Sequence, residues 1–241
     1  MRPSKVLMLF VPLAIAGFAV VSEYSGLDLF LARLFFDDAT QSWPLKSSFI
    51  TAGVLHKGAQ QMVVYFTVVL PLFMVLSLFI KRLRPHVKGA GYLFLCILFA
   101  TGIVALIKAS THIYTPWDLT LFGGDRPYIR LFDTVPSDLP VGHAFPGGHS
   151  SGGFAFVCLF FLLSVYRPRY RYHGLVFGLA LGAVFAITQE LRGAHFLSHD
   201  LFSLVICWYV AWGLYAIMFR RERRLAGAKH HPTVCMETDT L

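Results

Sequence analysis

The chain has 241 residues, of which 56% are hydrophobic and only 14% are charged, and its mean hydropathy is +0.62. These values exclude an ordinary water-soluble domain and indicate a protein that crosses a membrane several times. The formal net charge of +8 is concentrated in loops and at the ends of the chain, so it favours contact with anionic lipid headgroups and excludes nucleic acid as the expected partner.

Six apolar runs are the candidates for membrane-spanning helices. Four of them are long enough to cross a hydrocarbon core of about 30 Å, and two are shorter or carry polar residues at one end. The expected spans are 6–22, 62–80, 90–107, 149–166, 174–189 and 201–219. They predict one all-α membrane domain, 1–219, followed by a basic tail, 220–241. The run after "MRPSK" lacks a small-residue cleavage site, so we expect a retained anchor rather than a signal peptide.

Basic residues indicate the orientation of the helices. Six spans place both termini on one side, and that side holds "KRLRPHVK" at 81–88, three arginines within 167–171 and the basic tail. By the positive-inside rule this side is cytoplasmic. We therefore expect both termini in the cytoplasm and the two longest loops on the outer side.

The segment 23–61 is not apolar enough to cross a membrane, but part of it has a helical pattern. In "LDLFLARLFFDD" the apolar residues recur at helical spacing while Asp28 and Arg33 lie elsewhere. This predicts an amphipathic helix on the outer membrane surface. The members of its apolar face are Leu27, Phe30, Leu31, Leu34 and Phe35.

Two further features concern packing and loops. In the fifth span, Gly174, Gly178 and Gly182 recur every four residues, which predicts close packing of that helix against a neighbour. The outer loop 108–148 has five prolines and no convincing helical pattern. Long loops of this kind are often functional.

Three polar clusters fall at the outer face in this topology. They are Lys108 at the end of the third span, "AFPGGHSSGG" at 144–153 and "QELRGAHFLSHD" at 189–200. Ionisable residues at membrane depth are costly, so their presence points to function. Because the three clusters share one face, they are expected to form one site.

The second cluster suits the binding of an anion. Its glycines, Gly148 among them, let the backbone approach a ligand, and Ser150 adds a hydroxyl group. A helix follows directly, and its unpaired N–H groups and positive dipole end favour negative charge. The turn therefore predicts a phosphate-binding helix start.

The third cluster supplies groups for phosphoryl transfer. Arg192 has the planar fork that grips two phosphate oxygens. His195 can attack phosphorus through a neutral imidazole nitrogen, and Asp200 can hold its tautomer. From the second cluster, His149 can protonate the leaving oxygen.

A metal site is the main alternative for the third cluster. His195 and His199 are four residues apart and share a face on a helix, and Asp200 or Glu190 would add oxygen ligands. The pair lacks the internal glutamate of the zinc protease motif, and a metal would not account for Lys108. The prediction is a site without metal or cofactor.

Together these clusters resemble the type 2 phosphatidic acid phosphatase family, whose signature is K-x6-R-P, P-S-G-H and S-R-x5-H-x3-D. The resemblance covers roughly residues 62–220. It implies a six-helix membrane core, shared with vanadium haloperoxidases, and an active site on the outer face. It also implies that Lys108 binds phosphate, that His149 is the general acid and that His195 is the nucleophile.

Both arginines of the signature are displaced in this chain. The K-x6-R spacing counted from Lys108 places the first arginine at position 115, where this chain has Thr115. Arg126 lies eleven residues further on and is a possible substitute. Gln189 stands at the position of the second arginine, and Arg192 follows three residues later. These arginines remain candidate phosphate ligands.

The serine and the aspartate of the signature are also changed. Gly147 stands where serine is usual, and His199 stands where the aspartate is expected, with Asp200 next. On a continuous helix, five residues rotate two side chains about 140° apart. Asp200 would reach His195 only if the sixth helix began near Ser198, so either His199 or Asp200 is expected to support His195.

The resemblance implies a phosphatase that acts on a membrane lipid at the periplasmic face of a bacterial-type inner membrane. The substrates known for the family are undecaprenyl pyrophosphate, phosphatidylglycerol phosphate, phosphatidic acid and the lipid A 1-phosphate. A lipid phosphotransferase, a histidine-based membrane metalloenzyme and a non-catalytic lipid-binding or transport protein are the alternatives.

Overall fold

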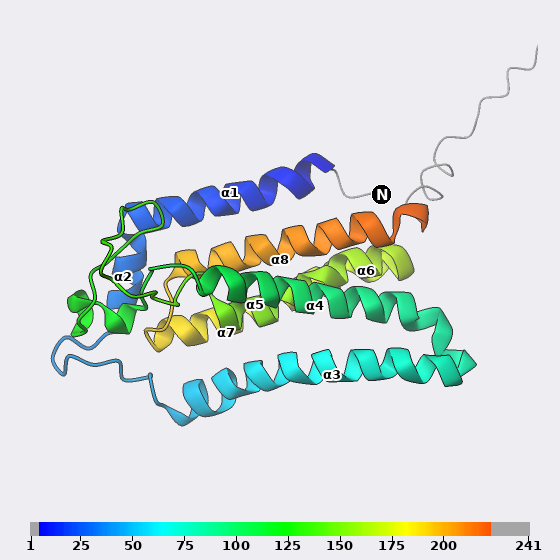
Figure 1. Ribbon diagram of the computed structural model, residues 1–241, viewed down its shortest axis with the longest axis horizontal. Helices are drawn as coiled ribbons and strands as arrows, with labels where there is room; N and C mark the ends of the chain where they lie inside the picture. Colours follow the sequence, from blue (N-terminus) through cyan, green and yellow to red (C-terminus); the bar gives the residue numbers. More distant parts are fainter. Residues whose placement is uncertain (1–4, 223–241) are drawn as a thin grey trace, which may run out of the picture.

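The computed structural model describes residues 5–222 and shows a bundle of long helices (Figure 1). Six helical stretches among these residues are long and apolar enough to cross a membrane, which confirms the predicted number. The stretches are Val6–Tyr24, Phe49–Phe79, Lys81–Lys108, Gly148–Tyr166, Pro168–Leu191 and Leu197–Met218. Most of the predicted basic tail, from 223 onward, lies outside the described residues.

The helices that build these stretches are mostly continuous. The first, third and fourth are α1 (Lys5–Tyr24), α3 (Lys57–Phe79) and α4 (Val87–Lys108). The fourth span is formed by α5 (Gly148–Phe154), a 3₁₀ turn at Ala155–Val157 and α6 (Cys158–Tyr166). The last two spans contain α7 (Arg171–Leu191) and α8 (Leu197–Met218).

Helix α8 packs against α1, α4, α5 and α6, and α3 packs against α4 and α5 at the edge of the bundle (Figure 1). Hydrogen bonds from buried rings join α8 to its neighbours. The Tyr92 hydroxyl of α4 donates to the Ala211 carbonyl, and Trp208 Nε1 donates to the Met8 carbonyl of α1. Since the partners are main-chain atoms inside an apolar bundle, these bonds satisfy groups that lipid could not.

The glycines of α7 make the predicted close packing possible. A Cβ on Gly178 would overlap the backbone of Val157, and one on Gly182 would overlap the ring of Phe154. The prediction of close helix contact is therefore confirmed. This contact holds the beginning of α5 beside the end of α7, where two of the predicted polar clusters lie.

The second span begins thirteen residues earlier than the predicted start at 62. A π-helical segment, η1 (Phe49–His56), leads directly into α3, so part of 23–61 belongs to the span. The polar residues His56 and Gln60 interrupt the apolar run in the sequence. In the structure His56 contacts the ring of His149 and Gln60 lines a cavity, so their polarity does not end the helix.

The predicted amphipathic helix is present as α2 (Leu27–Arg33). Phe30 and Leu34 are exposed, as expected for an apolar face turned outward. Asp28, which lies outside that apolar face, is only 1% exposed. Its Oδ1 accepts hydrogen bonds from the Ser22 hydroxyl and from the Ser198 N–H at the start of α8, so the Asp28 side of α2 faces the bundle, whereas Arg33 is exposed.

The outer loops cover the same end of the bundle as α2. The loop after α4 contains two short 3₁₀ turns, Pro116–Asp118 and Thr120–Phe122, and is otherwise irregular, as predicted. Its Phe122 ring packs against Phe36 and Trp43, with ring centroids 5.2 and 5.3 Å away. This aromatic contact joins the two outer loops.

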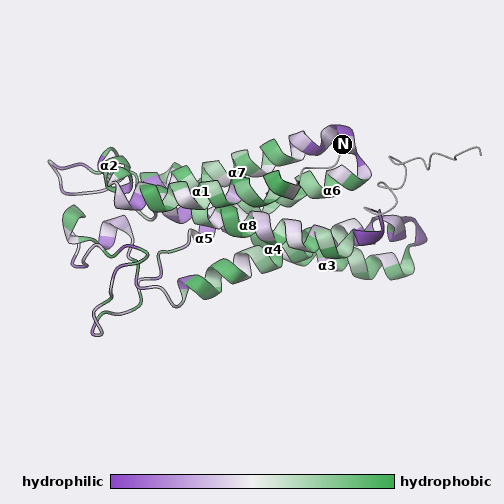
Figure 2. Cartoon of the chain, turned by 90° about the horizontal axis from the view of Figure 1, so that it is seen from above, coloured by the Kyte–Doolittle hydropathy of each residue, from purple (hydrophilic) through white to green (hydrophobic). Residues whose placement is uncertain are grey.

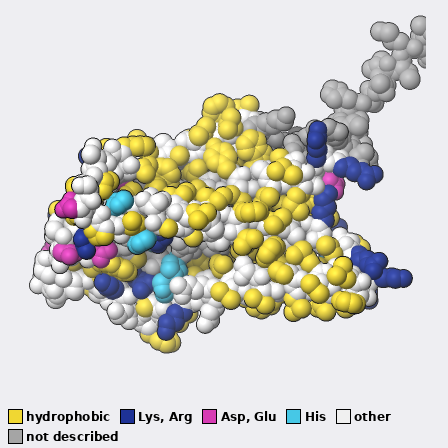
Figure 3. All heavy atoms as spheres, in the orientation of Figure 1, with side chains coloured by type: hydrophobic (Ala, Val, Ile, Leu, Met, Phe, Trp, Pro, Cys, Tyr) yellow, Lys and Arg dark blue, Asp and Glu magenta, His cyan; other side chains and the backbone are white. Residues whose placement is uncertain are grey.

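The two ends of the bundle differ in their side chains. Green, apolar helical segments lie between more hydrophilic ends (Figure 2). Histidine side chains gather at the end that carries the outer loops, where Lys, Arg and acidic side chains are mixed, and a further group of Lys and Arg side chains lies at the opposite end (Figure 3). Basic residues at that opposite end come from η2 (Lys81–His86) and η6 (Pro168–Tyr170).

Candidate active site

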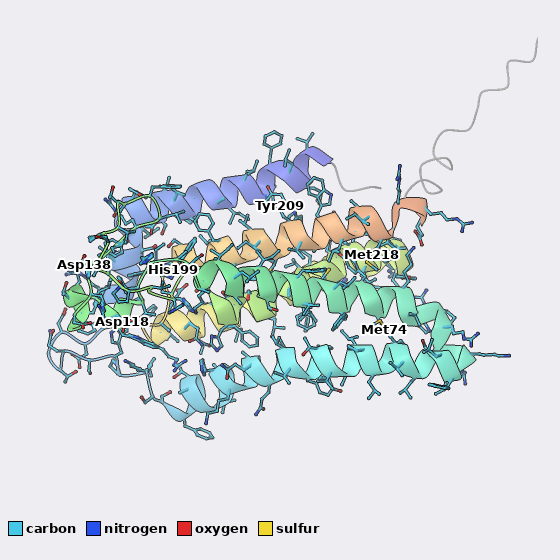
Figure 4. All side chains as sticks on the ribbon, viewed as in Figure 1. Met74, Asp118, Asp138, His199, Tyr209 and Met218 are labelled. Atoms are coloured by element: carbon cyan, nitrogen blue, oxygen red, sulfur yellow. The ribbon has the colours of Figure 1, made fainter. Side chains whose placement is uncertain are left out.

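The three predicted polar clusters converge at the end of the bundle that carries the outer loops. Lys108 is the last residue of α4, and its Nζ lies 3.6 Å from the position of a Cβ on Gly148, the first residue of α5. Lys108, Gly148 and His149 line a cavity of about 490 Å³, whose other walls come from α3 and from Thr101 of α4. Figure 4 shows His199 at the same end of α8.

Main-chain hydrogen bonds fix the turn before α5 against α8. The Gly147 N–H donates to the His199 carbonyl at 3.0 Å, and the Ser203 hydroxyl donates to the Gly147 carbonyl at 2.8 Å. Ser150 is fully buried, and its hydroxyl also donates to the Gly147 carbonyl. The Ser150 proton is therefore used to hold the turn.

The loop that carries His195 is fixed in a similar way. Gly193 has a φ of +74°, and a Cβ there would overlap the Trp43 ring. The Gly193 carbonyl accepts from the Trp117 N–H, and the Ala194 N–H donates to the Gln189 carbonyl. Because only glycine adopts this conformation readily and leaves room for the ring, Gly193 sets the turn that places His195 between α7 and α8.

His195 is only 4% exposed, and its Nδ1 is buried without a hydrogen-bond partner. Burial, together with the positive charge of Lys108, lowers the pKa of His195 well below its usual value. The ring is therefore neutral near pH 7, and one of its nitrogens carries a free lone pair. A neutral imidazole is what a nucleophile at phosphorus requires.

Neither candidate partner of His195 is hydrogen-bonded to it in the part of the chain that is described. The His199 ring packs edge-on against Phe145 and Phe196, and neither of its nitrogens has a partner. Its ring centroid is 5.8 Å from that of His195. The nearby ring can shape the pocket around His195 but does not orient Nδ1 through a hydrogen bond.

Asp200 faces away from the place where it was expected. Helix α8 begins at Leu197, close to the Ser198 start that would have let Asp200 reach His195. The carboxylate instead lies against Gly147, where a Cβ would overlap Oδ1, and neither of its oxygens has a hydrogen-bond partner. The expectation that His199 or Asp200 orients His195 thus receives no support from the hydrogen bonds.

His149 belongs to a chain of contacts that the sequence did not reveal. Its ring stacks on the ring of His56, with centroids 4.1 Å apart and planes 30° apart. Gln189 Nε2 lies 3.2 Å from His56 Nδ1, and Gln189 Oε1 accepts a hydrogen bond from Arg192. His56 was missed from the sequence because the residue lies in the segment 23–61, which was not expected to cross the membrane. In the structure His56 lies one helical turn before Gln60 in the second span.

The two displaced arginines have different places. Arg192 donates to Gln189, the residue at the position of the family's arginine, and to the Lys46 carbonyl. Its guanidinium group therefore stays next to the expected position. Arg126 instead lies beside Asp125 and over the Tyr114 ring, and within the described residues no contact joins it to Lys108 or His195.

Residues 5–222 contain no group of three or more His, Cys, Asp or Glu side chains that is arranged to hold a metal ion. The stacked pair of His56 and His149 and the edge-on pair of His195 and His199 are thus separate ring contacts. What the arrangement offers is a lysine, a partly buried histidine and the first N–H groups of a helix around one cavity. The buried His195 ring and the Arg192 guanidinium group lie close to these residues.

Comparison with known proteins agrees with this arrangement. The family model of the PAP2 superfamily matches residues 89–223. A curated lipid A 4'-phosphatase of Francisella tularensis subsp. novicida (strain U112) is 23% identical over 173 residues, which cover 70% of this chain and 77% of that protein. No solved structure matches the chain.

Proposed function

This chain belongs to the PAP2 superfamily, and from that premise we propose that it is a lipid phosphatase that works through a phosphohistidine at His195. The observation that carries the proposal is that Lys108 of α4 and His149 of α5 line one cavity, and that both lie close enough to His195, in the turn between α7 and α8, to lower its pKa. The likeness to a lipid A 4'-phosphatase supports a phosphorylated membrane lipid as the substrate.

Binding of the phosphate group relies on positive charge and on main-chain donors. Lys108 and Arg192 supply the charge, and the N–H groups near Gly148 and His149 supply donors at the beginning of a helix. These groups would stabilise the extra negative charge that builds up on the equatorial oxygens in the transition state.

The reaction then takes two steps. In the first, a ring nitrogen of His195 forms a bond to phosphorus while the bond from phosphorus to the leaving oxygen breaks, and His149 gives that oxygen a proton. In the second, His149 takes a proton from water, whose oxygen attacks phosphorus and releases His195. The products are the dephosphorylated lipid and inorganic phosphate.

Lipid access is supported by the shape of the cavity. Its walls away from Lys108 include Val63 and Val64 of α3, Thr101 of α4 and Gly152 of α5. Helix α3 lies at the edge of the bundle (Figure 1), so the cavity would open between α3 and α4 toward the hydrocarbon region. Apolar chains could then remain in the bilayer while the headgroup reaches the histidines.

The proposed site lies at the periplasmic face of a bacterial-type inner membrane, with both termini in the cytoplasm. The support is the distribution of charge, since η2 and η6 place basic side chains at the end of the bundle opposite the histidines. Fusion of a reporter that works only in the cytoplasm to 86 and to 143 would test this orientation.

The decisive experiment measures phosphate release by the purified chain in detergent. Lipid A is the first substrate to test, because of the curated relative, and the others are undecaprenyl pyrophosphate, phosphatidylglycerol phosphate and phosphatidic acid. We expect inhibition by vanadate, which mimics the five-coordinate transition state, and full activity in a chelator. Equal activity of His195→Ala and the parent would contradict the proposal.

The same experiment separates the alternatives. Transfer of labelled phosphate to a second lipid without release would identify a phosphotransferase. Loss of activity in chelator, restored by a divalent ion, would identify a metalloenzyme. Binding of lipid without any reaction would identify a non-catalytic protein.

A further inference from the structure

A buried carboxylate from α2 lies beside His195. Asp28 is 1% exposed, and its Oδ1 accepts hydrogen bonds from the Ser22 hydroxyl at 2.7 Å and the Ser198 N–H at 3.2 Å. Its Oδ2 is buried and has no partner. A buried polar atom without a partner is costly in free energy, so this oxygen needs a functional or structural explanation.

Asp28, Glu190 and His195 line one small cavity between α2, the end of α7 and the beginning of α8. Its volume is about 10 Å³, which is near the lower limit for a single water molecule. The cavity can therefore hold at most one water between these side chains. Glu190 also interacts with Asp200, whose Oδ1 lies against Gly147.

Two unsatisfied groups thus lie around the same cavity. Nδ1 of His195 has no partner, and neither has Oδ2 of Asp28. One is a ring nitrogen that can carry a hydrogen, and the other is a carboxylate oxygen that can accept it. A third group, the Glu190 carboxyl, lines the same cavity.

We propose that Asp28, paired with Glu190, is the positioning carboxylate of His195 in place of the displaced Asp200. The inference rests on the proposed function, in which His195 is the nucleophile. The Asp28 carboxylate accepts the Nδ1–H of His195 through one water in this cavity, which leaves the Nε2 lone pair free to attack phosphorus. When Nε2 bonds to phosphorus the ring becomes cationic, and the carboxylates stabilise that charge.

The surroundings of Asp28 suit this role. Burial raises the pKa of Asp28 above its usual value, so its carboxylate accepts a hydrogen bond more strongly than an exposed one. Its bond to the Ser198 N–H ties the group to the first turn of α8, one residue before His199 and three after His195. Helix α2 is thereby part of the active site as well as of the membrane surface.

The kinetic test uses Asp28→Asn and Glu190→Gln. Asparagine keeps the Oδ1 that accepts from Ser22 and Ser198, so the fold is expected to survive. We expect each variant to lower kcat at least about tenfold and to leave KM within about twofold, because phosphate binding is done by other groups. Asp38→Asn, an exposed acid in the following loop, is the control and should match the parent.

A second readout does not depend on any substrate. With ¹⁵N-labelled histidine in detergent, the parent is expected to show His195 as the Nδ1–H tautomer, and Asp28→Asn to show a mixture of tautomers. If Asp28→Asn fails to fold, Glu190→Gln alone supplies both measurements.

The outcomes separate the two proposals. Parent-like kcat and tautomer in both variants, with an inactive His195→Ala, would overturn the role of Asp28 and leave the phosphatase intact. The same split of kcat from KM in Asp200→Asn alone would return the role to Asp200. Absence of phosphate release by the parent would contradict the proposed function, while the tautomer would still test the role of Asp28.

Discussion

The carboxylate of Asp200 occupies the space that a side chain on Gly147 would need: a Cβ at residue 147 would overlap Asp200 Oδ1. Two departures from the family's signature therefore belong together. The usual serine is replaced by glycine at the one place where the aspartate, shifted by one residue to 200, comes closest to the turn before α5.

Gly147→Ala should lower the unfolding temperature, since the added carbon must displace both the Asp200 carboxylate and the Ser150 hydroxyl. Overpacking of this kind costs about 1–3 kcal/mol. In the background of Asp200→Ala the same substitution should cost less, because only the Ser150 hydroxyl must then move. Thermal unfolding in detergent measures all four chains, and strictly additive losses would show that the two residues do not compete for space.

His149→Ala should lower kcat by about 10²- to 10⁴-fold on a lipid phosphate, the usual contribution of a general acid. The loss should be much smaller on an aryl phosphate, whose leaving group departs without a proton. Steady-state rates on both substrates provide the measurement. His173→Ala, at the opposite end of the bundle and exposed, is the matched control. Equal losses on the two substrates would argue against proton donation by His149.

Replacement of His56 should separate stacking from hydrogen bonding. His56→Phe keeps a ring against His149 but removes the acceptor for Gln189, whose other end holds Arg192. We expect KM to rise about fivefold, the value of one ordinary hydrogen bond, with little change in kcat. His56→Ala should lower kcat as well, because the His149 ring loses its support. Identical kinetics for the two variants would rule out a separate role for the stack.

Asp28→Asn should leave the unfolding temperature at pH 7 equal to or above that of the parent. Because burial raises the pKa of Asp28 in the folded chain, the folded state holds this proton more tightly than the unfolded state. Its contribution to stability is complete below the usual aspartate pKa and is lost as the pH rises through the raised value. The other titratable groups near it are Glu190 and His195, which line the same cavity, and Glu23 and Tyr128.

The measurement is the unfolding temperature between pH 4 and 8 for the parent and Asp28→Asn. The advantage of the variant should shrink toward pH 4, where the parent's Asp28 is protonated. The opposite result would be an unfolding temperature of Asp28→Asn that falls below that of the parent at pH 7 but not at pH 4. That result would show that the charged carboxylate stabilises the fold. Combined with a lower kcat of the variant, the expected result would show that Asp28 raises the activity of the protein and lowers its stability at pH 7.

Much of the fold was predictable because it depends on hydropathy and on spacing. The six spans, α2 and the contact made by the α7 glycines all follow from patterns along one helix. The gathering of Lys108, His149 and His195 also follows, since an even number of short crossings returns these residues to one face. Such patterns describe which side of a helix is apolar and which end of a span is polar.

The missed features depend on contacts between segments far apart in the chain. The spacing in α2 separates Asp28 from the apolar face but contains no sign that the Ser198 N–H will meet it. A hydropathy window that stops at polar residues begins the second span too late and leaves out His56. The sixth span was predicted to begin at 201, whereas α8 begins at Leu197; the missing Cβ at Gly147 leaves the space that the Asp200 side chain takes.

The position of α2 and η1 has a consequence for how this chain can be recombined with its relatives. The family match begins at residue 89, yet Asp28 and His56 lie next to the two histidines that we propose as catalytic, and both come from before that point. A chimera that joins the first 60 residues of one relative to the remainder of another would therefore exchange residues next to the proposed site along with the first span. Its turnover, and not only its insertion into the membrane, should then follow the donor of those first 60 residues.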